Sequence, residues 1–288
     1  MLLRDFLLRI HLCKGIGIKG KGLIYQWAQQ QSKWDDISAK KLCQVGHITK
    51  FRHQFSNSYN WLMQSPTTVN ELVMGERWVC ISDDSYPLKL KEGYEPPLIL
   101  FYRGNWQLIN TPSLAIVGSR KATNYSLKVL EKLLTPTICQ KLTIVSGLAD
   151  GVDSLAHYRS IYLQGSTIAV IGTGLDIFYP AKNKKLQQDI ANNHLLISEY
   201  PNGTRGYRSH FPERNRIIAG ITETLLVTEA AQHSGSLITA NLALQNNRNV
   251  LAVPGSILSP ISIGTNELIE AGAKPILRPE AILEEFVS

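Results

Sequence analysis

Leu-Ala-Ile-Val-Gly-Ser-Arg, residues 114–120, places four consecutive apolar side chains directly before two small residues and a cation. A strand with one face in water alternates apolar and polar residues, so an uninterrupted apolar run indicates a strand covered on both faces. Five more such runs follow, separated by longer stretches with helical periodicity: 142–145, 167–171, 195–197, 225–227 and 250–253. Because short buried strands alternate with helices, we predict an α/β fold with an extended Rossmann-like parallel sheet and flanking helices.

The segment that precedes the sheet has a different pattern and a different charge. Residues 1–78 show helical periodicity and carry 11 Lys/Arg against 5 Asp/Glu, within a chain whose formal net charge is +7. We therefore predict a small all-helical domain over 1–78 and a sheet domain over 79–288, in which 79–112 adds an edge strand. A cationic module suits a polyanionic partner, although a solvated basic surface that serves solubility has the same composition.

A glycine-rich string, Gly15–Gly22, lies between two predicted helices of this front segment. It resembles the turn of a helix-hairpin-helix, whose backbone N–H groups and lysines contact DNA phosphates. A plain helical turn capped by glycine explains the same residues.

The composition is that of a globular protein without a membrane anchor. No stretch approaches the roughly 18 apolar residues that a membrane helix needs. Met1–Cys13 carries Arg4, Asp5 and Arg9 at helical spacing, which indicates an amphipathic helix rather than a secretory signal. The four cysteines are far apart and form no CxxC pair, so we expect a cytoplasmic protein with no disulfide, no metal site and no cofactor.

The residues that follow the apolar runs supply a candidate site. The carboxyl ends of parallel strands meet at one edge of a sheet, and ligands of open sheets bind there. Small residues at those ends let backbone amides approach an anion, and cations beside aromatic rings are typical of single-stranded nucleic-acid binding. We predict a single-stranded-DNA interface made of Gly118, Ser119, Arg120, Ser146, Gly147, Tyr179, Lys182, Asn183, Lys184, Lys185, Phe211, Arg214, Asn215, Arg216, Ser234, Gly235 and Ser236.

Structural explanations of the same residues stay open at this stage. Arg214 and Arg216 are equally suited to internal ion pairs, for example with Glu199 or Glu229. Phe211, like Phe178, is also suited to the core.

Two features raise the alternative of an enzyme. Gly172-Thr173-Gly174 is similar to a dinucleotide-binding turn, but Ile177 stands where the third glycine belongs. Asp153 and His157, four residues apart on a predicted helix, would share a face as an acid–base pair. A helix-capping aspartate and a locally paired histidine are the commoner explanation, and we expect no catalytic activity.

Several motifs together resemble those of the DprA/Smf (DNA-processing A) family, over about residues 79–288. They are Gly118-Ser119-Arg120, Ser146-Gly-Leu-Ala-Asp-Gly-Val-Asp153, Tyr179-Pro-Ala-Lys-Asn183, His210-Phe-Pro-Glu-Arg-Asn-Arg-Ile-Ile-Ala-Gly220, Ser234-Gly-Ser-Leu-Ile-Thr239 and Gly264-Thr-Asn-Glu-Leu-Ile-Glu-Ala-Gly-Ala273. Ala181 departs from the lysine that some relatives carry after Tyr-Pro. The front segment is similar to the SAM-like domain of some members.

The resemblance implies a function and a set of partners. Such proteins bind incoming single-stranded DNA during natural transformation, displace single-strand-binding protein and load the RecA recombinase. They are homodimers without known catalytic activity, which implies an interface in the closing segment, for which we name Leu244, Ile269 and Ile276. Because the sequence stops near residue 288, we expect no C-terminal winged helix. By resemblance, the phosphate pocket is lined by Gly118, Ser119, Arg120, Ser146, Gly147, Asn183 and Lys185.

The runner-up is a nucleotide-processing enzyme on a related fold, such as a nucleotide phosphoribohydrolase. Those enzymes carry a PGGxGTxxE helix start, whereas Glu-Ala-Ala-Gln-His-Ser-Gly-Ser stands at residues 229–236. This difference disfavours hydrolysis.

Overall fold

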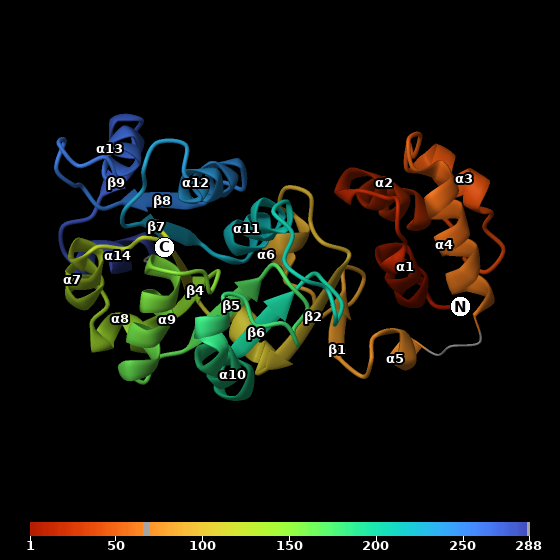
Figure 1. Ribbon diagram of the computed structural model, residues 1–288, viewed down its shortest axis with the longest axis horizontal. Helices are drawn as coiled ribbons and strands as arrows, with labels where there is room; N and C mark the ends of the chain where they lie inside the picture. The colour runs from red at the N-terminus through yellow and green to blue at the C-terminus, as the bar shows by residue number, and fades with distance from the viewer. Residues whose placement is uncertain (66–68, 287–288) are drawn as a thin grey trace.

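The computed structural model describes residues 1–65 and 69–286, and its centre is one mixed sheet (Figure 1). The strand order is β1-β2-β6-β5-β4-β3-β7-β8-β9. Strands β3 to β8 contain or overlap the six predicted runs and pair in parallel, which confirms the predicted fold class. The bounds are β1 Arg77–Cys80, β2 Ile99–Gly104, β3 Ser113–Val117, β4 Thr143–Ser146, β5 Thr167–Ile171, β6 Leu195–Ser198, β7 Thr224–Val227, β8 Asn249–Ala252 and β9 Lys274–Pro275.

Both faces of the sheet are covered. Alternate residues of β3 enter two different core clusters, Ala115 and Val117 on one side and Leu114 and Ile116 on the other. This division is the reason for the uninterrupted apolar run. The helices of the sheet domain are α6 Leu88–Lys91, α7 Asn124–Leu133, α8 Pro136–Lys141, α9 Val152–Tyr162, α10 Lys184–Asn193, α11 His210–Ile221, α12 Gly235–Gln245, α13 Ile263–Glu270 and α14 Glu280–Leu283, with 3-10 turns η1 Trp106–Asn110, η2 Ala181–Asn183 and η3 Glu284–Phe286.

The edge extension is antiparallel. Strand β1 pairs with β2, and β2 pairs with β6, where Phe101 lies opposite Ser198. The strand β1 begins at Arg77, so the predicted division after residue 78 falls inside this first strand.

The front segment is helical, with α1 Leu3–Leu12, α2 Ile18–Ala28, α3 Ala39–Val45, α4 Arg52–Gln64 and α5 Val69–Leu72. Gly15 in the turn between α1 and α2 has φ +83°, and a Cβ there would lie 2.9 Å from the backbone nitrogen of Phe55. Glycine is therefore required for the turn to pack against α4. None of the helices in residues 1–65 and 69–286 is long and apolar enough to cross a membrane.

The helical segment packs against the β1–β2–β6 end of the sheet (Figure 1), and one core cluster runs through both. The ring nitrogen Nε2 of His11 lies 2.7 Å from the carbonyl oxygen of Glu199, at the end of β6. The guanidinium of Arg4 lies 4.3 Å from the ring centre of Trp78 and 3.3 Å from the Asp83 carboxylate. The two parts therefore share polar contacts as well as apolar ones, and the contact of His11 is buried.

Two histidines make folding sensitive to acid. Burial lowers the pKa of His11 and of His157 from 6.5 to about 3. Each stays neutral in the folded protein but binds a proton in the unfolded chain below about pH 6.5, so acid favours unfolding. We expect the free energy of unfolding, measured by urea titration, to fall between about pH 7 and pH 5 by up to about 1.4 kcal/mol per pH unit for each histidine.

The matched variants are His11→Gln and His53→Gln, since His53 is exposed. The first should flatten the pH dependence by about one proton and the second should leave it unchanged. A wild-type slope in His11→Gln would contradict a buried neutral His11.

Candidate nucleic-acid interface

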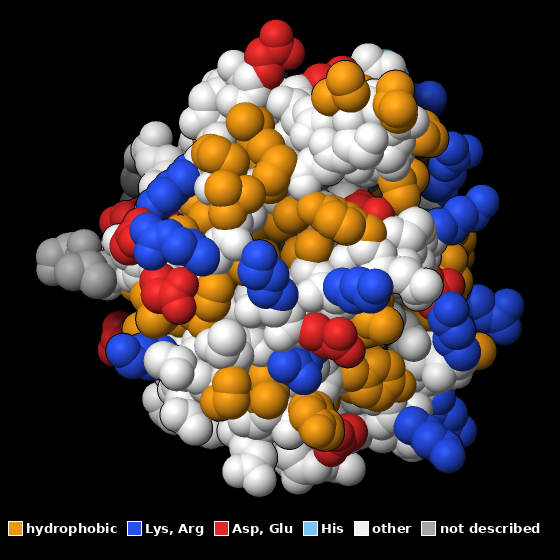
Figure 2. Space-filling model, turned by 90° about the vertical axis from the view of Figure 1, so that its left-hand side faces the viewer, with side chains coloured by type: hydrophobic (Ala, Val, Ile, Leu, Met, Phe, Trp, Pro, Cys, Tyr) orange, Lys and Arg blue, Asp and Glu red, His pale blue; other side chains and the backbone are white. Residues whose placement is uncertain are grey.

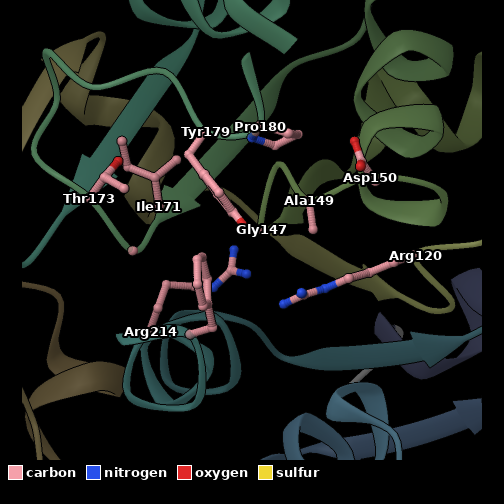
Figure 3. A pocket seen from close by; sticks show the side chains of 11 residues that line it. Arg120, Gly147, Ala149, Asp150, Ile171, Thr173, Tyr179, Pro180 and Arg214 are labelled. Atoms are coloured by element: carbon pink, nitrogen blue, oxygen red, sulfur yellow. The ribbon is translucent and has the colours of Figure 1, made fainter. Parts of the chain in front are cut away.

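The carboxyl ends of the parallel strands border a groove of about 640 Å³. A smaller inner pocket of about 50 Å³ adjoins it and shares several of its lining residues (Figure 3). The groove also takes in the N-terminal turns of α11 and α12, so side chains from separate motifs meet there. The predicted residues that line one or both hollows are Gly118, Ser119, Arg120, Gly147, Tyr179, Phe211, Arg214, Asn215, Ser234, Gly235 and Ser236.

Two guanidinium groups face the same space from different elements (Figure 3). Arg120 follows β3 and is exposed, and among the described residues its side chain has no hydrogen bond or ion pair. Arg214 on α11 is buried, and its Nη1 donates to the carbonyl oxygen of Val170 at 2.6 Å. Burial lowers the pKa of Arg214 to about 10, which leaves it charged at neutral pH. Paired guanidinium groups of this kind are suited to an anion such as phosphate.

The loop after β4 is shaped around Arg214. A Cβ on Gly147 would lie 1.7 Å from Nη1 of Arg214, so a residue without a side chain is required there. The Asp153 carboxylate accepts the backbone N–H groups of Gly147 at 3.1 Å and Ala149 at 3.4 Å. Burial raises the pKa of Asp153, and the positive charge of Arg214 acts in the opposite direction. The loop after β4 thus approaches the Arg214 guanidinium of α11 with its backbone, and the Asp153 carboxylate of α9 holds that loop and adds a counter-charge.

Aromatic rings stand at the rim of the pocket. The ring centres of Tyr179 and Phe211 lie 5.2 Å apart at an interplanar angle of 34°. The guanidinium of Arg120 lies 5.3 Å from the Phe211 ring centre. Tyr179 is 48% exposed, and Phe211 lines both hollows instead of lying wholly in the core. Rings beside cations are the arrangement in which bases stack while phosphates are neutralised.

Three predicted contact residues make internal hydrogen bonds and line neither hollow. Arg216 is buried and its Nη2 lies 2.8 Å from Oε1 of Glu199, the ion pair that the sequence left open. Ser146 donates to the carbonyl oxygen of Ile116 at 2.6 Å. The buried Asn183 donates to the carbonyl oxygen of Leu148 at 3.0 Å and so holds the loop after β4.

The three predicted lysines flank the pocket without lining it. Lys182 pairs with Asp150 at 3.0 Å, and the Nζ of Lys184 lies 5.0 Å from the Phe178 ring centre. Lys185 is exposed at the start of α10. They add positive charge beside Pro180, which does line the pocket.

The residues that suggested an enzyme divide between the site and the interior: Gly172 and Thr173 line the inner pocket, Asp153 lines the groove, and His157 lies in the interior. Nδ1 of His157 lies 2.6 Å from Oγ1 of Thr167, and the His157 side chain is fully buried away from the groove. In the Gly172-Thr173-Gly174 turn the N–H of Gly174 donates to the carbonyl oxygen of Thr204 at 2.9 Å. Among the described residues there is also no group of His, Cys, Asp and Glu side chains that could hold a metal ion.

Residues of two loops, the loop before α11 and the loop after β4, line the site although the sequence did not predict them. Gly206 and Arg208 line the groove, and Ala149 and Asp150 line the inner pocket. The signal for Arg208 was its position between two aromatic residues, Tyr207 and Phe211.

The three residues predicted for the dimer interface differ in exposure. Leu244 is 54% exposed on α12, and Ile269 is partly buried on α13. Ile276 is 2% exposed and packs in the second core cluster, so it offers no surface to a partner, which corrects its assignment.

The fold and site define a Rossmann-like protein with a cationic, aromatic-rimmed groove at the strand ends. The model of the family described as DNA recombination-mediator protein A matches residues 77–287. The chain is 48% identical over 206 residues to DNA processing protein DprA of Streptococcus pneumoniae, covering 72% of this chain and 73% of that protein. It is 34% identical over 270 residues to protein Smf of Escherichia coli, covering 91% and 70%. The chain therefore belongs to the DNA recombination-mediator protein A (DprA/Smf) family.

Solved structures agree with this assignment. The X-ray structure of DprA from Streptococcus pneumoniae matches with a TM-score of 0.90 and 36% identity over the whole of both chains. A structure of DNA processing protein A from Helicobacter pylori, which describes that protein's single-stranded DNA binding mode, matches with a TM-score of 0.64 and 29% identity. It covers 73% of this chain and 96% of the other.

The buried pair behind the groove should matter for stability. Burial acts to raise the pKa of Glu199, but the charge and hydrogen bond of Arg216 hold it below its ordinary value. Glu199→Ala leaves the buried Arg216 without its counter-charge, so we expect a loss of about 3–5 kcal/mol in the free energy of unfolding, measured by urea titration. The exposed carboxylate of Glu284, paired with Lys274 and Arg278, gives the control Glu284→Ala, which should change stability far less. Equal losses in the two variants would contradict this role of Glu199.

Proposed function

We propose that this protein binds single-stranded DNA in the groove at the strand ends and is not an enzyme. The observation that carries the proposal is the unpaired guanidinium of Arg120, which faces Arg214 beside the Tyr179–Phe211 ring pair. Phosphates bind the two cations and unstacked bases bind the rings. The single-stranded DNA binding described for the Helicobacter pylori relative supports this reading.

Single strands are preferred over duplex because of how the groove is built. The aromatic rings at its rim require a base face, which a duplex keeps inside its stack. The phosphate contacts carry no sequence information, so the protein binds with little sequence selectivity.

The wider role that we propose is DNA processing in the cytoplasm during natural transformation. A homodimer holds the incoming strand, displaces single-strand-binding protein and loads the RecA recombinase. This part rests on family membership.

For the runner-up, a phosphoribohydrolase-like enzyme, three described candidates for acid–base groups are held by internal hydrogen bonds. Glu229 accepts hydrogen bonds from the hydroxyls of Thr123 and Ser126, and so it orders the start of α7. Asp153 orders the loop after β4, and His157 is buried beside Thr167. This arrangement favours binding without hydrolysis.

The test of the proposed function compares a labelled oligothymidylate with a duplex of equal length across a salt series. We expect tighter binding to the single strand. Because a charge-assisted contact contributes about 1.5–3 kcal/mol, Arg120→Ala should weaken that binding roughly 10- to 100-fold. Lys40→Ala, at an exposed lysine of the helical segment, should have little effect because exposed charges are screened.

Two results would contradict the proposal: equal or tighter binding to duplex, or an Arg120→Ala variant that keeps wild-type affinity. Thermal unfolding of the same preparations separates lost binding from lost folding. Since Glu229 pairs with Thr123 and Ser126, Arg120→Ala removes no ion pair to that carboxylate and should remain folded.

The homodimer that we propose uses the C-terminal part of the chain. Figure 2 views this side of the molecule, and hydrophobic side chains gather in its upper half. Ile257 and Leu258 after β8 are 87% and 89% exposed, and Leu277 after β9 is 65% exposed. Exposed apolar groups of this kind are typical of interfaces, and a twofold dimer brings the same surface together twice.

Light scattering at micromolar concentration should give the mass of two chains. Leu258→Arg and Ile269→Arg should reduce it toward one chain, because a buried unpaired cation is strongly unfavourable. Leu88→Arg, at an exposed leucine of α6, is the control and should leave the mass unchanged. A wild-type monomer, or an unchanged mass in both C-terminal variants, would remove this interface.

A further inference from the structure

The loop between β6 and α11 carries an exposed aromatic side chain, that of Tyr207, which does not line the proposed groove. Tyr207 is 62% exposed, and the exposed Arg205 and Arg208 stand on either side of it in sequence. In the described part of the chain neither arginine has a hydrogen bond or an ion pair. We propose, on the basis of the proposed function, that Tyr207 is a second base-stacking platform for the DNA strand as it leaves the groove.

The loop passes directly against the ring pair of the groove. A Cβ on Gly206 would lie 3.3 Å from Cζ of Phe211, 3.3 Å from Cγ2 of Thr173 and 3.9 Å from Cγ of Tyr179. Gly206 itself lines the groove, as does Arg208. Tyr207 therefore lies in sequence between two residues that line the groove, Gly206 and Arg208.

The ring of Tyr207 rests on a fixed support. Its edge meets the ring of His210 with centres 5.1 Å apart and an interplanar angle of 72°. His210 in turn stacks on Tyr200 with centres 3.9 Å apart at 11°. The hydroxyl of Tyr200 donates to Glu213 at 2.7 Å, and Nδ1 of His210 lies 3.1 Å from the carbonyl oxygen of Gly172. A ring held in this way loses little conformational freedom when a base stacks on it.

Exposure alone does not make a tyrosine a base-stacking platform. Tyr162 is 77% exposed on α9 and lies near Arg159, with 5.7 Å from the guanidinium to its ring centre, but it does not border the groove. Tyr207 differs in its continuity with the groove, in its ring support and in its two free cations. Base stacking next to neutralised phosphates is the expected use of that combination.

In this proposal Tyr207 stacks with the base that follows the nucleotide held in the groove. Phosphates held at Arg120 and Arg214 leave their base at the Tyr179–Phe211 rim, and a following base stacks on Tyr207 while Arg205 or Arg208 neutralises its phosphate. Since every base has a π-face, the platform selects for an unpaired base and not for a sequence.

The experiment measures the affinity of labelled oligothymidylates of increasing length for wild type, Tyr207→Ala, Tyr207→Phe and Tyr162→Ala. With strands long enough to leave the groove, Tyr207→Ala should bind about 10-fold more weakly, because it loses one stacked base. With the shortest strand that binds, it should match wild type. Tyr207→Phe keeps the ring and should keep the affinity, and Tyr162→Ala should behave as wild type at every length.

A scan with one abasic position per oligonucleotide locates the stacked base. At the position that meets Tyr207, removing the base should weaken wild type about 10-fold and leave Tyr207→Ala unchanged, because the two changes remove the same contact. A Tyr207→Ala variant that binds all lengths as wild type does, while Arg120→Ala binds weakly, overturns the platform and leaves the groove in place. Absence of single-strand binding in the wild type overturns both.

Discussion

A buried cation organises the site. Arg214 donates to a backbone carbonyl oxygen, that of Val170, and its guanidinium is the closest side chain to the space that a Cβ of Gly147 would occupy. A buried charge is tolerated only where polar groups and counter-charge compensate it. The carbonyl oxygen of Val170 supplies the polar group and the Asp153 carboxylate in the first turn of α9 supplies the counter-charge, while Gly147 leaves room for the guanidinium. With Arg120 in front, the site keeps an excess of positive charge that an anion neutralises.

Helix α11 also carries a side chain that points into the interior of the protein. Arg216, two residues after Arg214, turns away from the groove and pairs with Glu199 at the end of β6. The carbonyl oxygen of Glu199 lies against His11 of the helical segment, and burial lowers the pKa of Lys21 nearby. Helix α11 therefore contributes Arg214 to the groove and, through the Arg216–Glu199 pair, holds the residue that His11 of the helical segment contacts.

Sequence patterns could not predict which side chains face the groove and which face the interior. The apolar runs predicted the parallel strands, and the small and cationic residues after them predicted where Arg120 and Gly147 would meet, because strand ends converge at one edge. Two arginines two positions apart on a helix point in nearly opposite directions, and only the packing of α11 decides which one meets the groove. The inward direction of the Asn183 and Ile276 side chains escaped prediction for the same reason, since their motifs fixed the position in the chain and not the direction of the side chain. The loop with Tyr207 has no periodicity that would place it against Phe211.

On the proposed function, the groups in the site suit a single strand better than a small nucleotide or a duplex. Arg214 is buried, Arg120 and Tyr179 are exposed, and Phe211 is partly exposed beside them. A ligand uses both kinds of group when it presents phosphates to the guanidinium groups and flat, accessible base faces to the rings. A duplex has its bases stacked and paired, so it satisfies the cations and leaves the rings unused. A mononucleotide satisfies one part of the groove and leaves the rest in water. A flexible strand repeats the phosphate–base unit along the groove, and on the proposed function each added unit meets a further cation or ring.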